Sequence, residues 1–485
     1  MTTAVAPEAA DAMLAAVDSG VADSAAVAVE AADSATTAAA PDAAALPPSP
    51  VPEVPQTLEA TGLTADHVEQ LLMKALYTGE ASGSALANRL CLAYSILEPL
   101  VERLRREQLI EVRGATGTGT AGYKYAVTDL GRDRARQYMD ANAYIGAAPV
   151  PLTQYVAQMK ALAAARGYID RYRIRAGFSE LIVGDDVLEK LGPAVNAGKG
   201  VFLYGPPGNG KTVLAEGMGR SLGGDLYVPH AIDVEGQTIT VFDPNSHQPI
   251  DPEPSQSIVA ATVGDRRWVR IRRPVIMVGG ELTLDMLDLR FNPIAKFYEA
   301  PLQLKANGGV FLVDDFGRQR MRPEELLNRW IVPLESRVDY LTLHTGRKLQ
   351  IPFDVLVIFA TNLDPLKLAD EAFLRRIPYK IEILDPNPDQ FARIFELNCR
   401  RKNVPYDTGM LEYLHREHYA PVNRPLRACH PRDLLEQVIA LCRYRGQQTV
   451  LTPELLDSAC RNYFVDDDGD VGSKPYVAVT TGASR

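Results

Sequence analysis

The chain contains Gly205-Pro206-Pro207-Gly208-Asn209-Gly210-Lys211-Thr212, which fits the pattern GxxxxGK[ST] without a mismatch. The apolar run before it, residues 201–204, predicts a buried strand, and residues 213–222 after it predict a helix that stops at two glycines. Glycines let the backbone N–H groups of such a loop converge on phosphate oxygens, and a helix N-terminus favours negative charge. Because strand, loop and helix follow in order, the sequence predicts a nucleoside triphosphate site that extends from Gly205 to Val213.

Two side chains at the end of this phosphate loop (residues 205–212) have predicted roles. Lys211 is expected to reach the β- and γ-phosphates, and the hydroxyl of Thr212 is expected to bind Mg²⁺. The histidines show no metal-ligand spacing, so Mg²⁺ is the only metal that the sequence predicts.

Polar side chains follow two further apolar runs. Residues 308–313 lead into Asp314 and Asp315, and residues 355–360 lead into Thr361 and Asn362. Asp314 is placed to hold Mg²⁺ through water, and Asp315 to orient and deprotonate the attacking water. The Asn362 amide can lie between the γ-phosphate and these carboxylates. The sequence therefore predicts a site that hydrolyses ATP.

With these motifs, residues 181–464 resemble an AAA+ ATPase. The resemblance implies an α/β P-loop NTPase core, a parallel sheet between helices, over residues 181–385, and a C-terminal α-helical lid over residues 386–464. It also implies assembly into a homo-oligomeric, hexameric ring.

Two arginine motifs match the family residue by residue. Residues 370–376, Asp-Glu-Ala-Phe-Leu-Arg-Arg, resemble its arginine-finger segment, so Arg375 or Arg376 is expected to act on a neighbouring subunit's γ-phosphate. Residues 430–435, His-Pro-Arg-Asp-Leu-Leu, resemble its sensor-2 motif, which implies that Arg432 faces the γ-phosphate.

Two features favour a subgroup of that family. About a hundred residues separate Lys211 from Asp314, more than a short βαβ unit needs, which indicates an insertion. Residues 306–309 and 340–349 resemble the helix-2-insert and pre-sensor-1-hairpin arrangement of MoxR-like ATPases, magnesium-chelatase subunits and enhancer-dependent transcription activators. The GAFTGA loop of the activators is absent, which argues against that role.

The carboxylate pair departs from the family pattern, which has Asp-Glu where this chain has Asp-Asp. Asp315 is one methylene shorter than Glu, so its reach to the water differs. Either the site is repacked and active, or hydrolysis is slow.

The insertion contains the basic run 265–273. Strand alternation would place Arg266, Trp268, Arg270 and Arg272 on one face. The run is either a substrate-contacting loop of a central pore or a charged edge strand protected from aggregation.

Residues 57–146 show three helical patterns and two short strands. We expect helices after the N-cap Thr64, over residues 84–92 and over residues 95–108, a hairpin of residues 109–113 and 123–128, and a last helix from Asp129. This order resembles a winged helix-turn-helix domain. The arginines of its third helix are interleaved with glutamates and the hairpin loop carries no charge, so we favour protein docking over DNA binding.

Composition defines the remaining segments. Residues 1–56 are rich in Ala and Pro and hold eight acidic and no basic side chains, which predicts a disordered tail. Of the net charge of −10, the rest of the chain therefore carries only −2. Residues 147–180 are predicted to be a linker with a helix over 153–166, and residues 465–485 a flexible tail. The basic-aromatic run 168–175 is interpreted as a solvated surface rather than a nucleic-acid contact.

The five scattered cysteines indicate neither a disulfide framework nor a zinc site. No apolar run is long enough to indicate a membrane span, and the N-terminus does not resemble a secretory signal. We therefore expect a cytoplasmic protein.

Together these features predict a ring-forming ATPase that uses ATP and Mg²⁺ to remodel a client protein or complex, with the partner chosen by the winged-helix domain. One alternative is a DNA-directed motor or regulator. The other is a nucleotide-gated scaffold that does not hydrolyse ATP, which only Asp315 supports.

Overall fold

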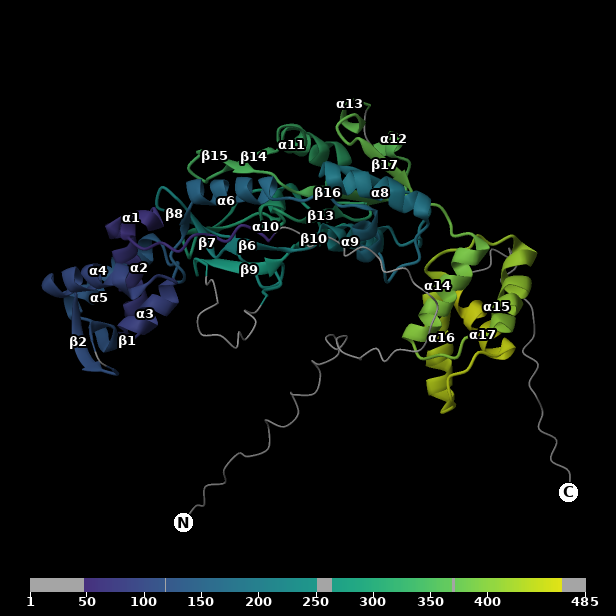
Figure 1. The fold of residues 1–485 in the computed structure, drawn as a ribbon, viewed down its shortest axis with the longest axis horizontal. Coiled ribbons are helices and arrows are strands. Elements are labelled where there is room, and N and C mark those ends of the chain that lie inside the picture. The colour runs from purple at the N-terminus through teal and green to yellow at the C-terminus, as the bar shows by residue number, and fades with distance from the viewer. Residues whose placement is uncertain (1–47, 118, 251–263, 369–370, 465–485) are drawn as a thin grey trace, which may run out of the picture. The chain divides into compact units, whose positions relative to one another are not determined.

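The computed structural model describes residues 48–117, 119–250, 264–368 and 371–464 (Figure 1). Most of the predicted N-terminal tail and the C-terminal tail therefore lie outside the described residues. Residues 48–56, predicted to belong to the disordered tail, have no regular secondary structure but make contacts with the folded chain. Pro52 and Pro55 are buried, the Pro50 carbonyl accepts a hydrogen bond from Gln158 at 2.5 Å, and the Pro52 carbonyl accepts one from the Asp265 amide at 3.1 Å. Proline fixes φ, so this segment loses little entropy when it packs.

The central sheet has five strands in the spatial order β10-β13-β16-β5-β17, and every neighbouring pair is parallel. The strands are β5 (Val201–Tyr204), β10 (Val275–Val278), β13 (Val310–Val313), β16 (Leu356–Thr361) and β17 (Tyr379–Glu382). The near-continuous apolar sequences of the inner strands β5, β13 and β16 fit a parallel sheet that is covered on both faces.

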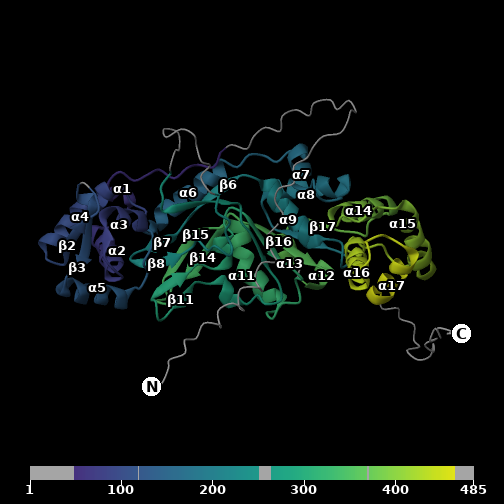
Figure 2. The same cartoon turned by 90° about the horizontal axis from the view of Figure 1, so that it is seen from below.

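Successive side chains of these strands enter two hydrophobic clusters. Phe202 and Phe311 pack with Trp330 of α11 (Pro323–Ser336), whereas Leu203 and Leu312 pack with α8 (Asp185–Ala197) and α9 (Lys211–Leu222). Figure 2 shows α8 and α9 on one side of β16 and α11 on the other. The predicted α/β P-loop core, a parallel sheet between helices, is confirmed.

The long insertion between α9 and β13 builds further strands. Strand β6 (Asp225–Pro229) pairs antiparallel with β9 (Trp268–Arg272). A second five-stranded sheet has the order β11-β12-β8-β7-β4. The insertion supplies β11 (Arg290–Asn292), β12 (Phe297–Glu299), β8 (Gln237–Thr240) and β7 (Ala231–Val234), and the chain before α6 supplies β4 (Val150–Pro151). The short helices η2 (Leu284–Leu287) and α10 (Leu302–Lys305) lie between β10 and β13 in the chain.

The basic run forms β9, and its unbroken pairing with β6 keeps Trp268, Arg270 and Arg272 at alternate positions of the strand, as predicted. Trp268 is buried and stacks on Tyr155, with ring centroids 6.4 Å apart, whereas Arg270 and Arg272 of the same strand are exposed. The edge of β9 that does not pair with β6 is also bonded, because the Arg272 amide donates to the carbonyl of Gln248 at 3.0 Å. A strand with partners on both sides fits a charged structural strand better than a mobile substrate loop.

An antiparallel hairpin, β14 (Val338–Thr342) and β15 (Lys348–Pro352), directly precedes β16, where the sequence predicted a hairpin. Its turn contains Gly346 at φ +85°, a left-handed conformation that favours glycine.

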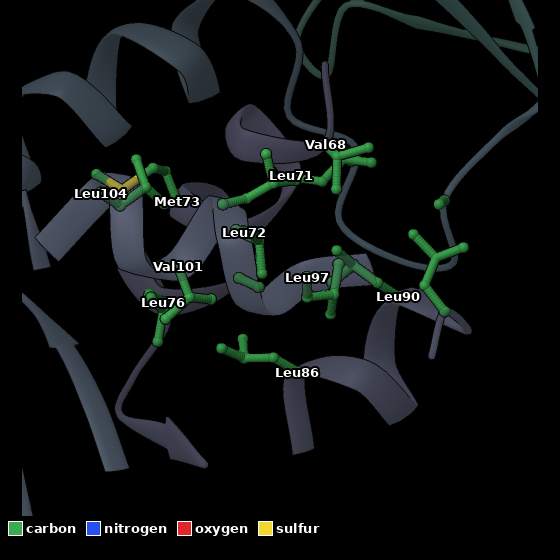
Figure 3. Packing of buried hydrophobic residues seen from close by; sticks show 14 of the residues in the cluster. Val68, Leu71, Leu72, Met73, Leu76, Leu86, Leu90, Leu97, Val101 and Leu104 are labelled. Carbon is green, nitrogen blue, oxygen red and sulfur yellow. The ribbon is translucent and has the colours of Figure 1, made fainter. Parts of the chain in front are cut away.

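The predicted N-terminal helices and hairpin occur in the predicted order, with bounds that differ by a few residues at most, and a short helix at Leu58–Thr61 and a short strand at Ala81–Ser82 occur in addition. They are the helices α1 (Leu58–Thr61), α2 (Ala65–Tyr77), α3 (Gly83–Leu90), α4 (Tyr94–Arg106) and α5 (Asp129–Ala141), with a three-stranded sheet β1-β3-β2 of Ala81–Ser82, Tyr123–Val127 and Ile110–Ala115. The side chains of Thr64, Ser82 and Thr128 cap α2, α3 and α5. Leu72, Leu76, Leu86, Leu97 and Val101 are among the residues of the hydrophobic core of this region (Figure 3).

Two helices occupy the predicted linker, α6 (Leu152–Ala164) and α7 (Arg171–Gly177). Arg171 and Arg175 of the basic-aromatic run each pair with a carboxylate of α8, Glu189 and Asp185, at 2.8 Å. These pairs favour the interpretation of a solvated surface over a nucleic-acid contact.

The C-terminal helices α14 (Pro388–Arg401), α15 (Thr408–Leu414), α16 (His430–Arg445) and α17 (Pro453–Tyr463) bury a hydrophobic cluster of their own. Within the described ranges, none of the helices has the length and apolar character needed to cross a membrane.

Candidate active site

Parallel strands bring the predicted site residues to one edge of the sheet. The phosphate loop follows β5, Asp314 and Asp315 follow β13, and Asn362 follows β16. Because β16 pairs with both β5 and β13, the three strand ends are neighbours.

The phosphate loop requires glycine at two positions for steric reasons. Gly205 has φ +132°, and a Cβ there would lie 2.3 Å from the Ile383 carbonyl oxygen. Gly208 has φ +83°, and a Cβ there would lie 2.6 Å from Cys429 Sγ. The loop therefore packs closely against the chain after β17 and against the segment before α16.

Lys211 begins α9 and is nearly buried, with 8% of its surface exposed. Its Nζ donates to the carbonyls of Gly205 at 3.0 Å and Pro206 at 2.9 Å, and to Asn362 Oδ1 at 2.5 Å. Burial lowers the pKa of Lys211, while the charges of Asp314 and Asp315 act in the opposite direction. The ammonium is thus held over the loop, next to the predicted Asn362 amide.

The two predicted metal ligands are in direct contact, because Thr212 Oγ1 donates to Asp314 Oδ2 at 2.7 Å. Mg²⁺ takes oxygen ligands and retains several of its waters, so this donor set fits it. In the described ranges, no group of three or more His, Cys, Asp or Glu side chains could hold a metal. A Mg²⁺ ion here would depend on Thr212, Asp314, water and phosphate oxygens.

Asp315 lies beside this pair and is exposed. Its Oδ1 is 3.5 Å from Asn362 Nδ2, at the outer limit of a hydrogen bond. Its φ of +47° is left-handed, a conformation that Asp adopts more readily than Glu, which gives a physical reason for the Asp-Asp pair.

Gln319 was not predicted, yet it fixes this turn. Its Nε2 donates to the carbonyls of Asp314 at 2.9 Å and Asp315 at 3.2 Å, and its Oε1 accepts from the Gly317 amide at 2.8 Å. It was missed because it lies outside the recognised motif of Asp314 and Asp315.

Arg375, Arg376 and Arg432 were predicted to act on a γ-phosphate. Arg375 is exposed and lines a hollow of about 910 Å³ with Tyr204, Glu371 and Lys380, among others, whereas Arg376 donates to Glu335 at 2.7 Å. Asp370, the first residue of the finger segment, lies outside the described residues.

Arg432, the predicted sensor-2 residue, donates to Asp433 at 2.8 Å, and its side chain is 58% exposed. A different arginine approaches the phosphate loop. Arg427 donates to Asp385 Oδ1 at 2.7 Å, and the same oxygen accepts a hydrogen bond from Asn209 Nδ2 at 2.7 Å. Arg427 was missed because it precedes the recognised motif.

This geometry defines a P-loop nucleotide-binding site at the carboxyl edge of a parallel sheet. A family model described as a domain of unknown function (DUF8689) matches residues 387–462, which contain α14 to α16 and all of α17 but its last residue.

Two curated proteins are similar to parts of the chain. The 26S protease regulatory subunit 6A of Caenorhabditis elegans is 26% identical over 218 residues, 44% of this chain and 38% of that protein. The vesicle-fusing ATPase of Dictyostelium discoideum is 48% identical over 50 residues, 10% of this chain and 6% of that protein. The chain thus spans well under half the length of either relative. Both similarities support the predicted relation to AAA+ ATPases.

Among solved structures, the RuvB Holliday junction branch migration motor of Thermotoga maritima is 16% identical, with a TM-score of 0.35 over 61% of this chain and 75% of that one. NtrX of Brucella abortus in complex with ADP is 12% identical, with a TM-score of 0.37 over 70% and 68%. Both scores are too low to support an argument about this chain.

Proposed function

We propose that this chain is an AAA+ ATPase that hydrolyses ATP with Mg²⁺ and uses the energy to remodel a client protein or complex in the cytoplasm. The observation that carries the proposal is the convergence of Lys211, the Thr212–Asp314 pair, Asp315 and Asn362 at neighbouring strand ends.

Each side chain has a role that follows from its position. Lys211 binds the β- and γ-phosphates, and Thr212 and Asp314 hold Mg²⁺, which neutralises phosphate charge when bound. The Asp315 carboxylate accepts the proton of the attacking water, while the Asn362 amide orients that water. The products are ADP and phosphate.

We infer a hexameric ring in which an arginine finger completes the neighbour's site. Arg375 is the better candidate of the two arginines, because it is exposed beside an open hollow. Arg376 remains the alternative, although it donates to Glu335.

The hairpin β14–β15 and the inserted strands support the helix-2-insert, MoxR-like layout. We assign α14 to α17 as the lid and residues 57–146 as the winged-helix domain that selects the partner. Helix α4, which the sequence predicted as the third helix of this domain, supports a protein partner over DNA. Its arginines are paired with carboxylates, Arg103 with Glu69 and Glu107 and Arg105 with Glu102. Arginines engaged in this way have fewer charges to offer to phosphates.

The proposal is tested by measuring ATP turnover of the purified chain and of Lys211→Ala, with and without duplex DNA. We expect turnover by the wild type, none by the variant, and little effect of DNA. Strong stimulation by DNA would favour the DNA-directed alternative, and equal turnover by both proteins would refute the assigned site.

A further inference from the structure

One carboxylate oxygen joins the phosphate loop to the C-terminal helices. Asp385 lies between β17 and α14, and its Oδ1 accepts hydrogen bonds from Asn209 of the loop and from Arg427 of the segment before α16, each at 2.7 Å. Asn209 is buried, and the side chains of Asp385 and Arg427 are 32% and 21% exposed. Charge-assisted hydrogen bonds with this degree of burial are stronger than those at an open surface.

Two further bonds join the same segments. The Ala428 amide donates to Asn209 Oδ1 at 3.1 Å, and the Cys429 amide donates to the Gly208 carbonyl at 2.8 Å. Both polar atoms of the Asn209 side chain are therefore bonded. The Arg427 Cβ would lie 3.6 Å from a Cβ at Gly208, so the stem of Arg427 packs on the loop itself.

We propose that Arg427 is a positioning residue that acts through Asp385 and Asn209 to hold the phosphate loop in its binding conformation. This rests on the proposed function, and it adds a second lid arginine with a role separate from that of Arg432. Because residues 427–429 lead directly into α16 and are bonded to Gly208 and Asn209, a movement of α16 would displace these two loop residues.

The electrostatics of the loop agree with this placement. Burial lowers the pKa of Lys211, and the positive charge of Arg427 acts in the same direction, against Asp314 and Asp315. The positive charge of Arg427 therefore acts on the Lys211 ammonium inside the loop.

The test compares the affinity for Mg²⁺·mant-ADP and the kcat and KM for ATP among the wild type, Arg427→Ala, Arg427→Lys, Asp385→Ala and the double variant Arg427→Ala/Asp385→Ala. Arg427→Ala should weaken mant-ADP binding and raise KM about tenfold, with kcat within about twofold, because the loop is loosened and the reacting groups are intact. Arg427→Lys should recover part of the affinity, because it keeps the charge but loses the planar fork.

Arg432→Ala is the matched control. ADP lacks the γ-phosphate that Arg432 is proposed to face, so this variant should bind mant-ADP normally and lose kcat. In the Asp385→Ala background, Arg427→Ala should cause much less loss than in the wild type, since the hydrogen-bonded path is already broken and only the packing of the Arg427 stem is left to lose.

Wild-type affinity in Arg427→Ala would overturn the proposal. A full tenfold loss that persists in the Asp385→Ala background would also overturn it, because Arg427 would then contact the nucleotide directly. If the wild type binds mant-ADP but hydrolyses no ATP, the proposed function fails, and the binding data still decide the role of Arg427.

Discussion

Replacing Gly208 by alanine tests how closely the segment before α16 packs on the phosphate loop. The new Cβ would lie 2.6 Å from Cys429 Sγ, in a residue whose φ is +83°. A left-handed conformation costs a residue with a Cβ about 1–2 kcal/mol, before any cost of the contact. For a chain of 485 residues that unfolds as one unit, that cost alone lowers Tm by about 1–2 °C.

Adding Cys429→Ala to Gly208→Ala separates the two costs. The remaining neighbours of the Cβ would be Arg427 Cβ at 3.6 Å and Cys429 Cβ at 3.8 Å, which are ordinary contacts. Thermal unfolding and mant-ADP titration should show that the double variant recovers the stability and affinity lost through the close contact. It should not recover the stability lost through the left-handed φ. If Gly208→Ala alone melts and binds nucleotide like the wild type, the close packing described above is refuted.

Three further outcomes follow from the site. Thr212→Ala should raise the Mg²⁺ concentration needed for half-maximal turnover by at least about tenfold, since it removes a hydroxyl bonded to Asp314; an unchanged Mg²⁺ titration would exclude Thr212 as a ligand. Mixing inactive Arg375→Ala with inactive Lys211→Ala subunits should restore part of the turnover, because each supplies what the other lacks at one interface; no recovery at any ratio would count against a finger at Arg375. Burial, with help from nearby arginines, lowers the pKa of His430 to about 4, so the folded state binds fewer protons than the unfolded state between pH 6.5 and 4, and stability should fall by about 3 kcal/mol across that window. Urea unfolding at pH 7 and pH 5 should show about 2 kcal/mol of this loss in the wild type and much less in His430→Gln.

The parts of the site that sequence predicted are local or tied to strand ends. The phosphate loop is a continuous strand, loop and helix, so its pattern can be read without tertiary structure. Asp314 and Asn362 were found because each ends an apolar run, and ends of parallel strands meet at one edge of the sheet.

The parts that were missed depend on contacts between distant segments. Asn209 and Asp385 are 176 residues apart, and no periodicity records their hydrogen bond. The burial of Trp268 was missed because Tyr155, its stacking partner, belongs to a helix more than a hundred residues earlier. The packing of Pro52 and Pro55 was missed because their composition is also typical of disorder.

ATP turnover by Asp315→Asn, measured beside its affinity for mant-ATP and Mg²⁺, decides whether the assembled groups form a hydrolytic site. The amide keeps the shape of the side chain and leaves Thr212 and Asp314 in place, but it cannot accept the proton of water. We predict affinity within about twofold of the wild type and turnover lower by at least about 100-fold, the usual contribution of a general base. Turnover at the wild-type rate would show that Asp315 is not the base, and a wild type that binds ATP without hydrolysing it would show a nucleotide-gated scaffold.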